Sequence, residues 1–165
     1  MTPRPGCGRV RAVCPGRCPA RSPLMSVAVH KSRTLINVEL DERSVLFPDG
    51  KFLSHLSIFE EAGLIRLEAV FLFNESRLPP DIAALAVEDA RELARAIMDG
   101  VFQGRTQHVL SDHAKIALIF NPNGFVLRFG DEPALRELFV ASPAIIRLAQ
   151  GLLRIVDRAS ATPAH

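Results

Sequence analysis

Hydrophobic and polar residues alternate along several short stretches of this 165-residue chain, a spacing that is typical of β-strands. In residues 34–40, TLINVEL, the apolar residues Ile36, Val38 and Leu40 alternate with polar ones. Residues 44–47, SVLF, form a second short apolar stretch, and the strong turn signal PDG follows it. The two stretches together predict an N-terminal hairpin.

Two further regions predict strands that are buried on both faces. Residues 64–73, LIRLEAVFLF, alternate at first and then become apolar throughout. Residues 105–130 contain the stretches RTQHVL, KIALIF and FVLRFG, which the turns SDHA and NPNG separate. This pattern predicts a three-stranded meander. Its middle strand is apolar on both faces, which is typical of a central strand.

The hydrophobic period changes to that of a helix in two places. Residues 82–102 carry an apolar stripe with charged residues opposite, and Asp81 after two prolines predicts the start of this helix. A second helical pattern begins near residue 131 with DEPALRELFVA. The Ser-Pro pair at 142–143 either bends this helix or begins a new one that reaches about Arg158.

Residues 52–63, FLSHLSIFEEAG, fit either a short helix that ends at Gly63 or an extension of the hairpin. The predicted order is therefore β-β-(α)-β-α-β-β-β-α. We expect an α+β fold, with a single, mostly antiparallel sheet of about five or six strands and two main helices packed on one face. Residues 25–160 form this single α+β domain, and residues 161–165 are expected to be a frayed tail.

Composition changes sharply just before Met25. Residues 1–24 hold five Arg, no acidic residue and all three Cys, whereas residues 25–165 hold 15 basic and 18 acidic residues. The first segment lacks the apolar centre of a secretory signal, and its Cys spacing matches no standard zinc site. We expect a disordered Arg/Pro/Cys-rich leader. The Cys-free remainder fits a cytoplasmic location, and no stretch approaches the roughly 18 apolar residues of a membrane span.

Histidine and acidic residues come together once, in the predicted meander. His108, Asp112 and His113 are types that hold a metal ion or relay protons. Histidines five positions apart suit neither one helix face nor one strand face, so we interpret this group as a turn between strands. Arg128, a lone charge in an apolar strand, either pairs with a carboxylate across strands or binds an anion. The chain has no GxSxG, P-loop, GxGxxG or HExxH motif, and we predict no catalytic residue, metal or cofactor.

One stretch is similar to a known family. Residues 54–68, SHLSIFEEAGLIRLE, resemble the recognition helix and wing of winged-helix repressors of the ArsR or MarR kind. The resemblance implies a helix here whose polar residues face DNA: Ser54, His55 and Ser57. The net negative charge after the leader and the adjacent Glu60 and Glu61 oppose contact with phosphates, so nucleic acid is a disfavoured partner.

Packing gives the main functional hypothesis. Two helices cover one face of a sheet whose central strands are apolar on both faces, so a second copy or a client protein is expected on the other. We predict a non-enzymatic protein-binding protein, such as an assembly factor, adaptor or chaperone-like protein, that forms a homodimer. The alternatives are a small-ligand or metal-dependent enzyme or sensor using His108, Asp112 and His113, and a DNA-binding regulator using residues 54–68. The predicted interface residues are Phe71, Phe73, Ile119, Phe125, Phe129, Ile145, Leu152 and Val156.

Overall fold

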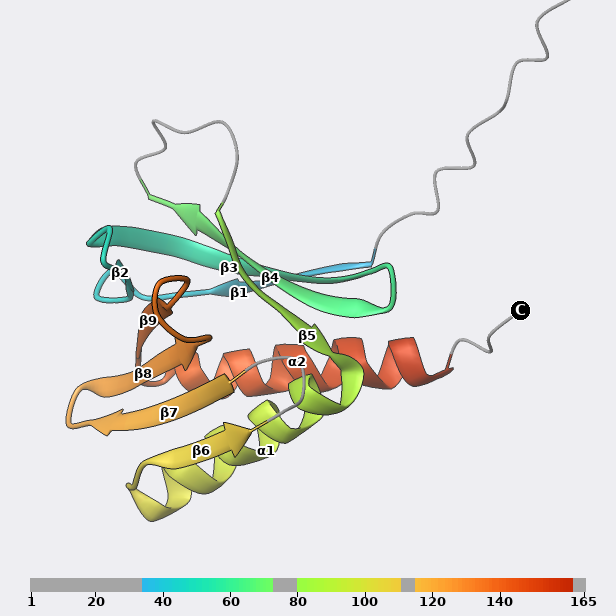
Figure 1. Ribbon diagram of the computed structural model, residues 1–165. Helices are drawn as coiled ribbons and strands as arrows, with labels where there is room; N and C mark the ends of the chain where they lie inside the picture. The colour runs from blue at the N-terminus through green and yellow to red at the C-terminus, as the bar shows by residue number, and fades with distance from the viewer. Residues whose placement is uncertain (1–33, 73–79, 111–114, 162–165) are drawn as a thin grey trace, which may run out of the picture. The chain divides into compact units, whose positions relative to one another are not determined.

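An antiparallel sheet and two helices make up the part of the chain that the computed structural model describes, residues 34–72, 80–110 and 115–161 (Figure 1). Within these residues the sheet has nine strands, and the α+β class is confirmed. The strands are β1 (Leu35–Glu39), β2 (Val45–Phe47), β3 (Lys51–Glu61), β4 (Leu64–Phe71), β5 (Asp81–Ala86), β6 (Gln107–Leu110), β7 (Lys115–Asn121), β8 (Gly124–Phe129) and β9 (Arg136–Ala141). The helices are α1 (Val87–Gln103) and α2 (Ala144–Ala161).

The chain builds the same arrangement twice, a set of antiparallel strands followed by a helix. The first half runs from β1 to α1 and the second from β6 to α2. The strand order is β5-β4-β3-β2-β9-β8-β7-β6, and β1 pairs with β3 beside β2 (Figure 1). The three-residue strand β2 therefore joins the halves, because it pairs with β3 on one side and β9 on the other.

Each helix packs mainly on the sheet of the other half. Helix α1 leaves β5 and packs on β6 and β7, whereas α2 leaves β9 and packs on β1 and β3; the helices also contact each other. A glycine in each helix permits the close approach of that helix to the strands beneath it. A Cβ at Gly100 would lie 2.8 Å from Leu118, and one at Gly151 would lie 2.9 Å from Val38. Both helices thus lie on the sheet face that holds the core.

A buried serine fastens the junction between the halves. The Ser44 hydroxyl accepts a hydrogen bond from the Ala141 N–H (3.2 Å), at the point where β9 leads into α2. Its carbonyl accepts from the Leu53 N–H in β3 (3.1 Å), and its N–H donates to the Asp41 carbonyl (2.9 Å). Ser44 is fully buried, so each of these bonds satisfies a group that water cannot reach.

Several sequence predictions are corrected. The sheet is larger than five or six strands, and β1 and β2 do not form a hairpin, because both pair with β3. Residues 52–63 lie in β3 and its following turn, so the helix that the winged-helix resemblance implies is absent. Asp81 begins β5 rather than a helix, and residues 136–141 are the strand β9. The three-stranded meander is confirmed as β6, β7 and β8, and the last helix reaches Ala161.

Two β-bulges explain why strands resembled helices. An extra residue, Ser54, interrupts the pairing of β3 with β4, so the buried residues Leu53 and Leu56 are three positions apart. The pairing of β5 with β4 shifts in the same way, and its buried residues Ile82 and Leu85 are again three apart. A spacing of three is typical of a helix, which is the period that the sequence suggested.

We predict that Ser44→Ala destabilises the protein by about 1–3 kcal/mol, because the buried Ala141 N–H would lose its acceptor. The control is Ser160→Ala, which removes an exposed hydroxyl that accepts from Arg91 (3.0 Å) and should change stability by less than about 0.5 kcal/mol. Urea unfolding of the variants and the wild type measures both. Equal unfolding midpoints for the three proteins would contradict this role of Ser44.

We predict that Ala62→Asn stabilises the protein by about 0.5–1 kcal/mol. Ala62 and Gly63 form the two-residue turn between β3 and β4 with φ of 53° and 79°. A turn with positive φ at both positions favours Asn-Gly, and alanine there is strained. Ala134→Asn, at an exposed alanine without positive φ, serves as control and should give no gain. Thermal unfolding measures the midpoint of each variant relative to the wild type. A lower midpoint for Ala62→Asn would mean that alanine is not strained at this position.

Candidate binding surface

The sheet face opposite the helices, here called the outer face, carries one continuous line of apolar side chains. The strand registers place one residue from each of five adjacent strands in direct cross-strand contact. At about 4.8 Å per strand, the line extends over about 19 Å. We call it the apolar row, and its members are Ile119 in β7, Val126 in β8, Phe139 in β9, Val45 in β2 and Phe52 in β3.

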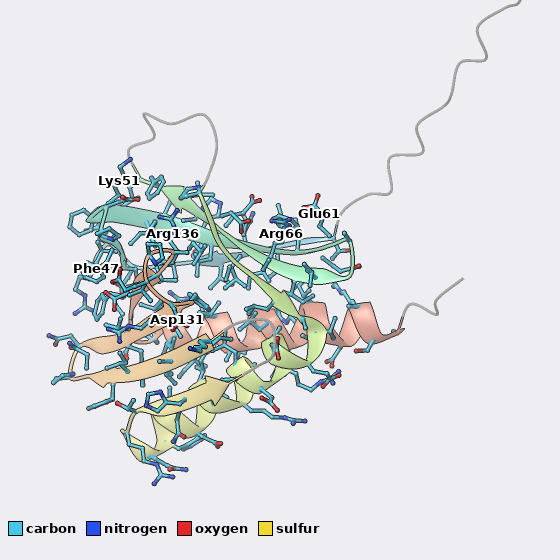
Figure 2. The ribbon with its side chains drawn as sticks, viewed as in Figure 1. Phe47, Lys51, Glu61, Arg66, Asp131 and Arg136 are labelled. Atoms are coloured by element: carbon cyan, nitrogen blue, oxygen red, sulfur yellow. The ribbon has the colours of Figure 1, made fainter. Side chains whose placement is uncertain are left out.

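Solvent reaches this row. Phe52 is 52% exposed, and the other four members are half-buried. Phe47 lies two residues along β2 from Val45, on the same face, and is 38% exposed. Figure 2 shows it near Lys51, at the end of the sheet where β2 and β3 meet. Leu72, whose N–H donates to the Phe52 carbonyl (3.2 Å), is 43% exposed. A contiguous exposed apolar surface is typical of an interaction site.

The neighbouring line on the same face, across β6, β7, β8 and β9, contains an ion pair and ends at Phe47 in β2. It contains His108 in β6, Ala117 in β7, Arg128 in β8 and Glu137 in β9. The Arg128 Nε donates to the Glu137 Oε1 at 2.7 Å, so the cross-strand pairing considered for Arg128 is present. His108 lies on the same face but two strands from Arg128, with Ala117 between them. The Arg128–Glu137 ion pair, whose charges cancel, therefore lies beside the apolar row.

The outer face of the first half is different, because several of its polar side chains contact one another within the chain. Arg66 lies 2.8 Å from Glu61 and 2.6 Å from Asp81, and Figure 2 shows Arg66 and Glu61 close together at the end of β3 and the start of β4. The Ser57 hydroxyl donates to the Asn37 Oδ1 at 3.1 Å. Among the described residues, the polar side chains of Arg66 and Ser57 therefore contact side chains of the same chain, in contrast to the apolar row.

The predicted ligand residues are not brought together among the described residues. His108 is exposed on β6, and Arg128 is paired with Glu137. Asp112 and His113 fall in residues 111–114, outside the described part of the chain. Across the described ranges, no group of three or more His, Cys, Asp or Glu side chains is placed to hold a metal ion.

The predicted interface residues are mostly in the core. Phe73 lies outside the described residues, and Ile119 is half-buried on the outer face. The others are buried inside the chain and offer a partner almost no surface: Phe71, Phe125, Phe129, Ile145, Leu152 and Val156. The apolar strands and the helix from which these residues were chosen therefore form the core of the chain. Of the predicted interface residues that the structure describes, only Ile119 belongs to the apolar row.

Sequence reasoning missed the other four members of the row, Val45, Phe52, Val126 and Phe139. The signal was present, since β2, β8 and β9 are apolar at consecutive positions rather than at alternate ones. In β9, Leu138 and Val140 face the core while Phe139 faces outward. Because of this double-sided pattern, Leu135, Leu138 and Phe139 also have a helical spacing, which is compatible with the helix that the sequence predicted from residue 131.

Comparison with known proteins identifies no family. No family model and no curated protein matches the chain. A crystal structure of Trypanosoma brucei MRP1/MRP2 is similar to 78% of this chain, over 83% of its own, with 13% sequence identity and a TM-score of 0.43. This likeness is too low to support an argument about fold or function. In the described residues, neither helix has the length and apolar character that crossing a membrane requires.

We predict that Arg128 and Glu137 are coupled by about 0.2–1 kcal/mol. Their side chains are 46% and 28% exposed, so water screens much of the attraction between them. A double-mutant cycle with Arg128→Ala, Glu137→Ala and the double variant, followed by urea unfolding, measures the coupling free energy. In the dissociated chain, a coupling above about 2 kcal/mol would contradict the exposure of the pair on the outer face.

Proposed function

We propose that this chain is a non-enzymatic protein-binding protein of the assembly-factor, adaptor or chaperone-like kind, and that it forms a homodimer through the apolar row. The observation that carries the proposal is the row itself, Val45, Phe52, Ile119, Val126 and Phe139, partly exposed on a face that no described element covers. Burying such a row releases its water and stabilises the complex, at roughly 25 cal/mol per Å² of apolar surface.

A second copy is compatible with this surface in polarity and charge. Two sheet faces pack about 10 Å apart when apolar side chains interdigitate between them. In a two-fold dimer the same patch meets itself, so it must be self-complementary. The apolar row has no charge, and the charges beside it, Arg128 and Glu137, already neutralise each other. No like charges at these positions would then oppose the stacking of two copies.

The test is the mass in solution of variants that change one side chain of the row. Phe52→Glu places a charge at one end of the row. Val126→Thr, next to the central residue Phe139, keeps the shape of the side chain but replaces a methyl group by a hydroxyl. Each substitution counts twice in a two-fold dimer, so Phe52→Glu should raise the dissociation constant by about 100-fold. Val126→Thr should raise it by about tenfold or more. Light scattering and sedimentation over a dilution series measure these constants.

The matched control is Phe102→Glu, which introduces the same charge at a phenylalanine that is 82% exposed at the end of α1, away from the row. This variant should dimerise like the wild type. A monomeric wild type, or a dimer that all three variants leave equally stable, would overturn the proposed interface. Thermal unfolding of each variant establishes that the fold is retained.

A further inference from the structure

Strand β1 has a free edge, whereas the corresponding edge of β2 pairs with β9. Strand β1 pairs with β3 on one side, and no described strand pairs with its other side. Further along the same edge, β9 pairs with β2 and stops at Ala141. The Leu40 N–H donates to the Ser54 carbonyl in β3 (3.0 Å), so the antiparallel alternation directs the N–H and C=O groups of Leu35, Asn37 and Glu39 away from β3.

A groove follows this open edge, between β1 and α2. Its volume is about 300 Å³. Four consecutive residues of β1, from Ile36 to Glu39, form one wall. The other wall is one face of α2 and consists of Arg147, Gln150, Gly151 and Arg154. Because Gly151 has no side chain, β1 and α2 approach closely at the floor, while the exposed side chains around it form the rim.

The helix wall of the groove is cationic. Arg147 and Arg154 are two turns apart on one face, about 10 Å along the helix axis, with the neutral Gln150 between them. The Arg147 guanidinium donates to the Glu39 carbonyl from Nε (3.1 Å) and Nη2 (3.0 Å), which orients it but leaves its charge unneutralised. Arg154 is exposed and has no ion pair or hydrogen bond among the described residues.

The geometry points to this groove as a docking site for an extended acidic peptide of a partner protein, which adds to β1 as a further strand. The peptide would lie in line with β9, beyond Ala141. Backbone hydrogen bonds to Leu35 and Asn37 would hold it at the edge, and acidic side chains on the face toward α2 would contact Arg147 and Arg154. Acidic side chains on one face of an extended chain recur about every 7 Å, so two or three successive ones span the 10 Å between these two arginines.

Charge favours this occupant over the alternatives. If two copies paired antiparallel through β1, their α2 helices would lie on the same side of the joined sheet and bring Arg147 and Arg154 toward the same residues of the other copy. Like charges at such short range disfavour that dimer. The first 33 residues of the chain contain no Asp or Glu, so they do not supply the acidic strand either. The inference is independent of the proposed dimer, because the apolar row lies elsewhere on the sheet.

The test uses the full-length protein and three dye-labelled ten-residue peptides in fluorescence anisotropy titrations. The first alternates Val and Glu, the second is the same peptide with alternate backbone nitrogens methylated on one edge, and the third replaces Glu by Lys. We expect binding of the first peptide only, since methylation removes the donors that pair with β1 while it retains the charge. Arg154→Glu should weaken binding by about tenfold or more, whereas the control Arg95→Glu, an exposed cation of α1, should not.

Three results would overturn the inference. The first is no binding of the Val-Glu peptide at 1 mM. A dissociation constant of 1 mM corresponds to a binding free energy of about −4 kcal/mol, so even weak strand addition is detected at this concentration. The second is equal binding of the methylated peptide, which would exclude strand addition. The third is equal competition by an oligothymidine, which would indicate a general anion site. Light scattering of Arg154→Glu separates this test from the dimer proposal, because a change in the groove should leave the mass in solution unchanged.

Discussion

The short ladder from β3 through β2 to β9 is the contact on which the rest of the fold depends. Only three residues of β2 link a first set of strands to a second, and Ser44 fastens the same point with bonds to β3 and β9. Because this junction is continuous, the halves share one sheet and one core face. Each helix then covers strands of the other half. Gly100 lets α1 approach β7 closely, and Gly151 lets α2 approach β1.

The same junction produces the surface to which we attribute function. The apolar row runs through β2, so its members from the first and second halves, Phe52 on one side and Phe139 on the other, become neighbours only when β2 pairs with both strands. The junction also ends β9 at Ala141 and begins α2 beside β1, which leaves the β1 edge open next to a cationic helix. The pairing of β2 with β3 and β9 thus creates both the apolar row and the open edge of β1 on the same sheet.

The fold class, the meander of β6 to β8 and the final helix followed from hydrophobic period and turn residues alone. The strands that were mistaken for helices have physical causes. Bulges at Ser54 and in β5 change the buried spacing from two to three, and Phe139 faces outward between two core residues of β9. The pairing of β2 with β9 joins residues about 90 positions apart, and no local pattern specifies such a contact. The apolar row could not be assembled without that register, although its hallmark, apolarity on both strand faces, was visible in the sequence.

The central claim is that a second copy covers the apolar row, and solvent access to the row tests it most directly. Methyl NMR spectra recorded with a soluble paramagnetic agent report how closely water approaches Val45, Ile119 and Val126 in the unaltered protein. If a second copy covers the row, these methyl groups are protected at high protein concentration and become accessible on dilution, while those of Leu35, which is 51% exposed on β1, stay accessible throughout. Equal accessibility of the row at every concentration would mean that no second copy covers it.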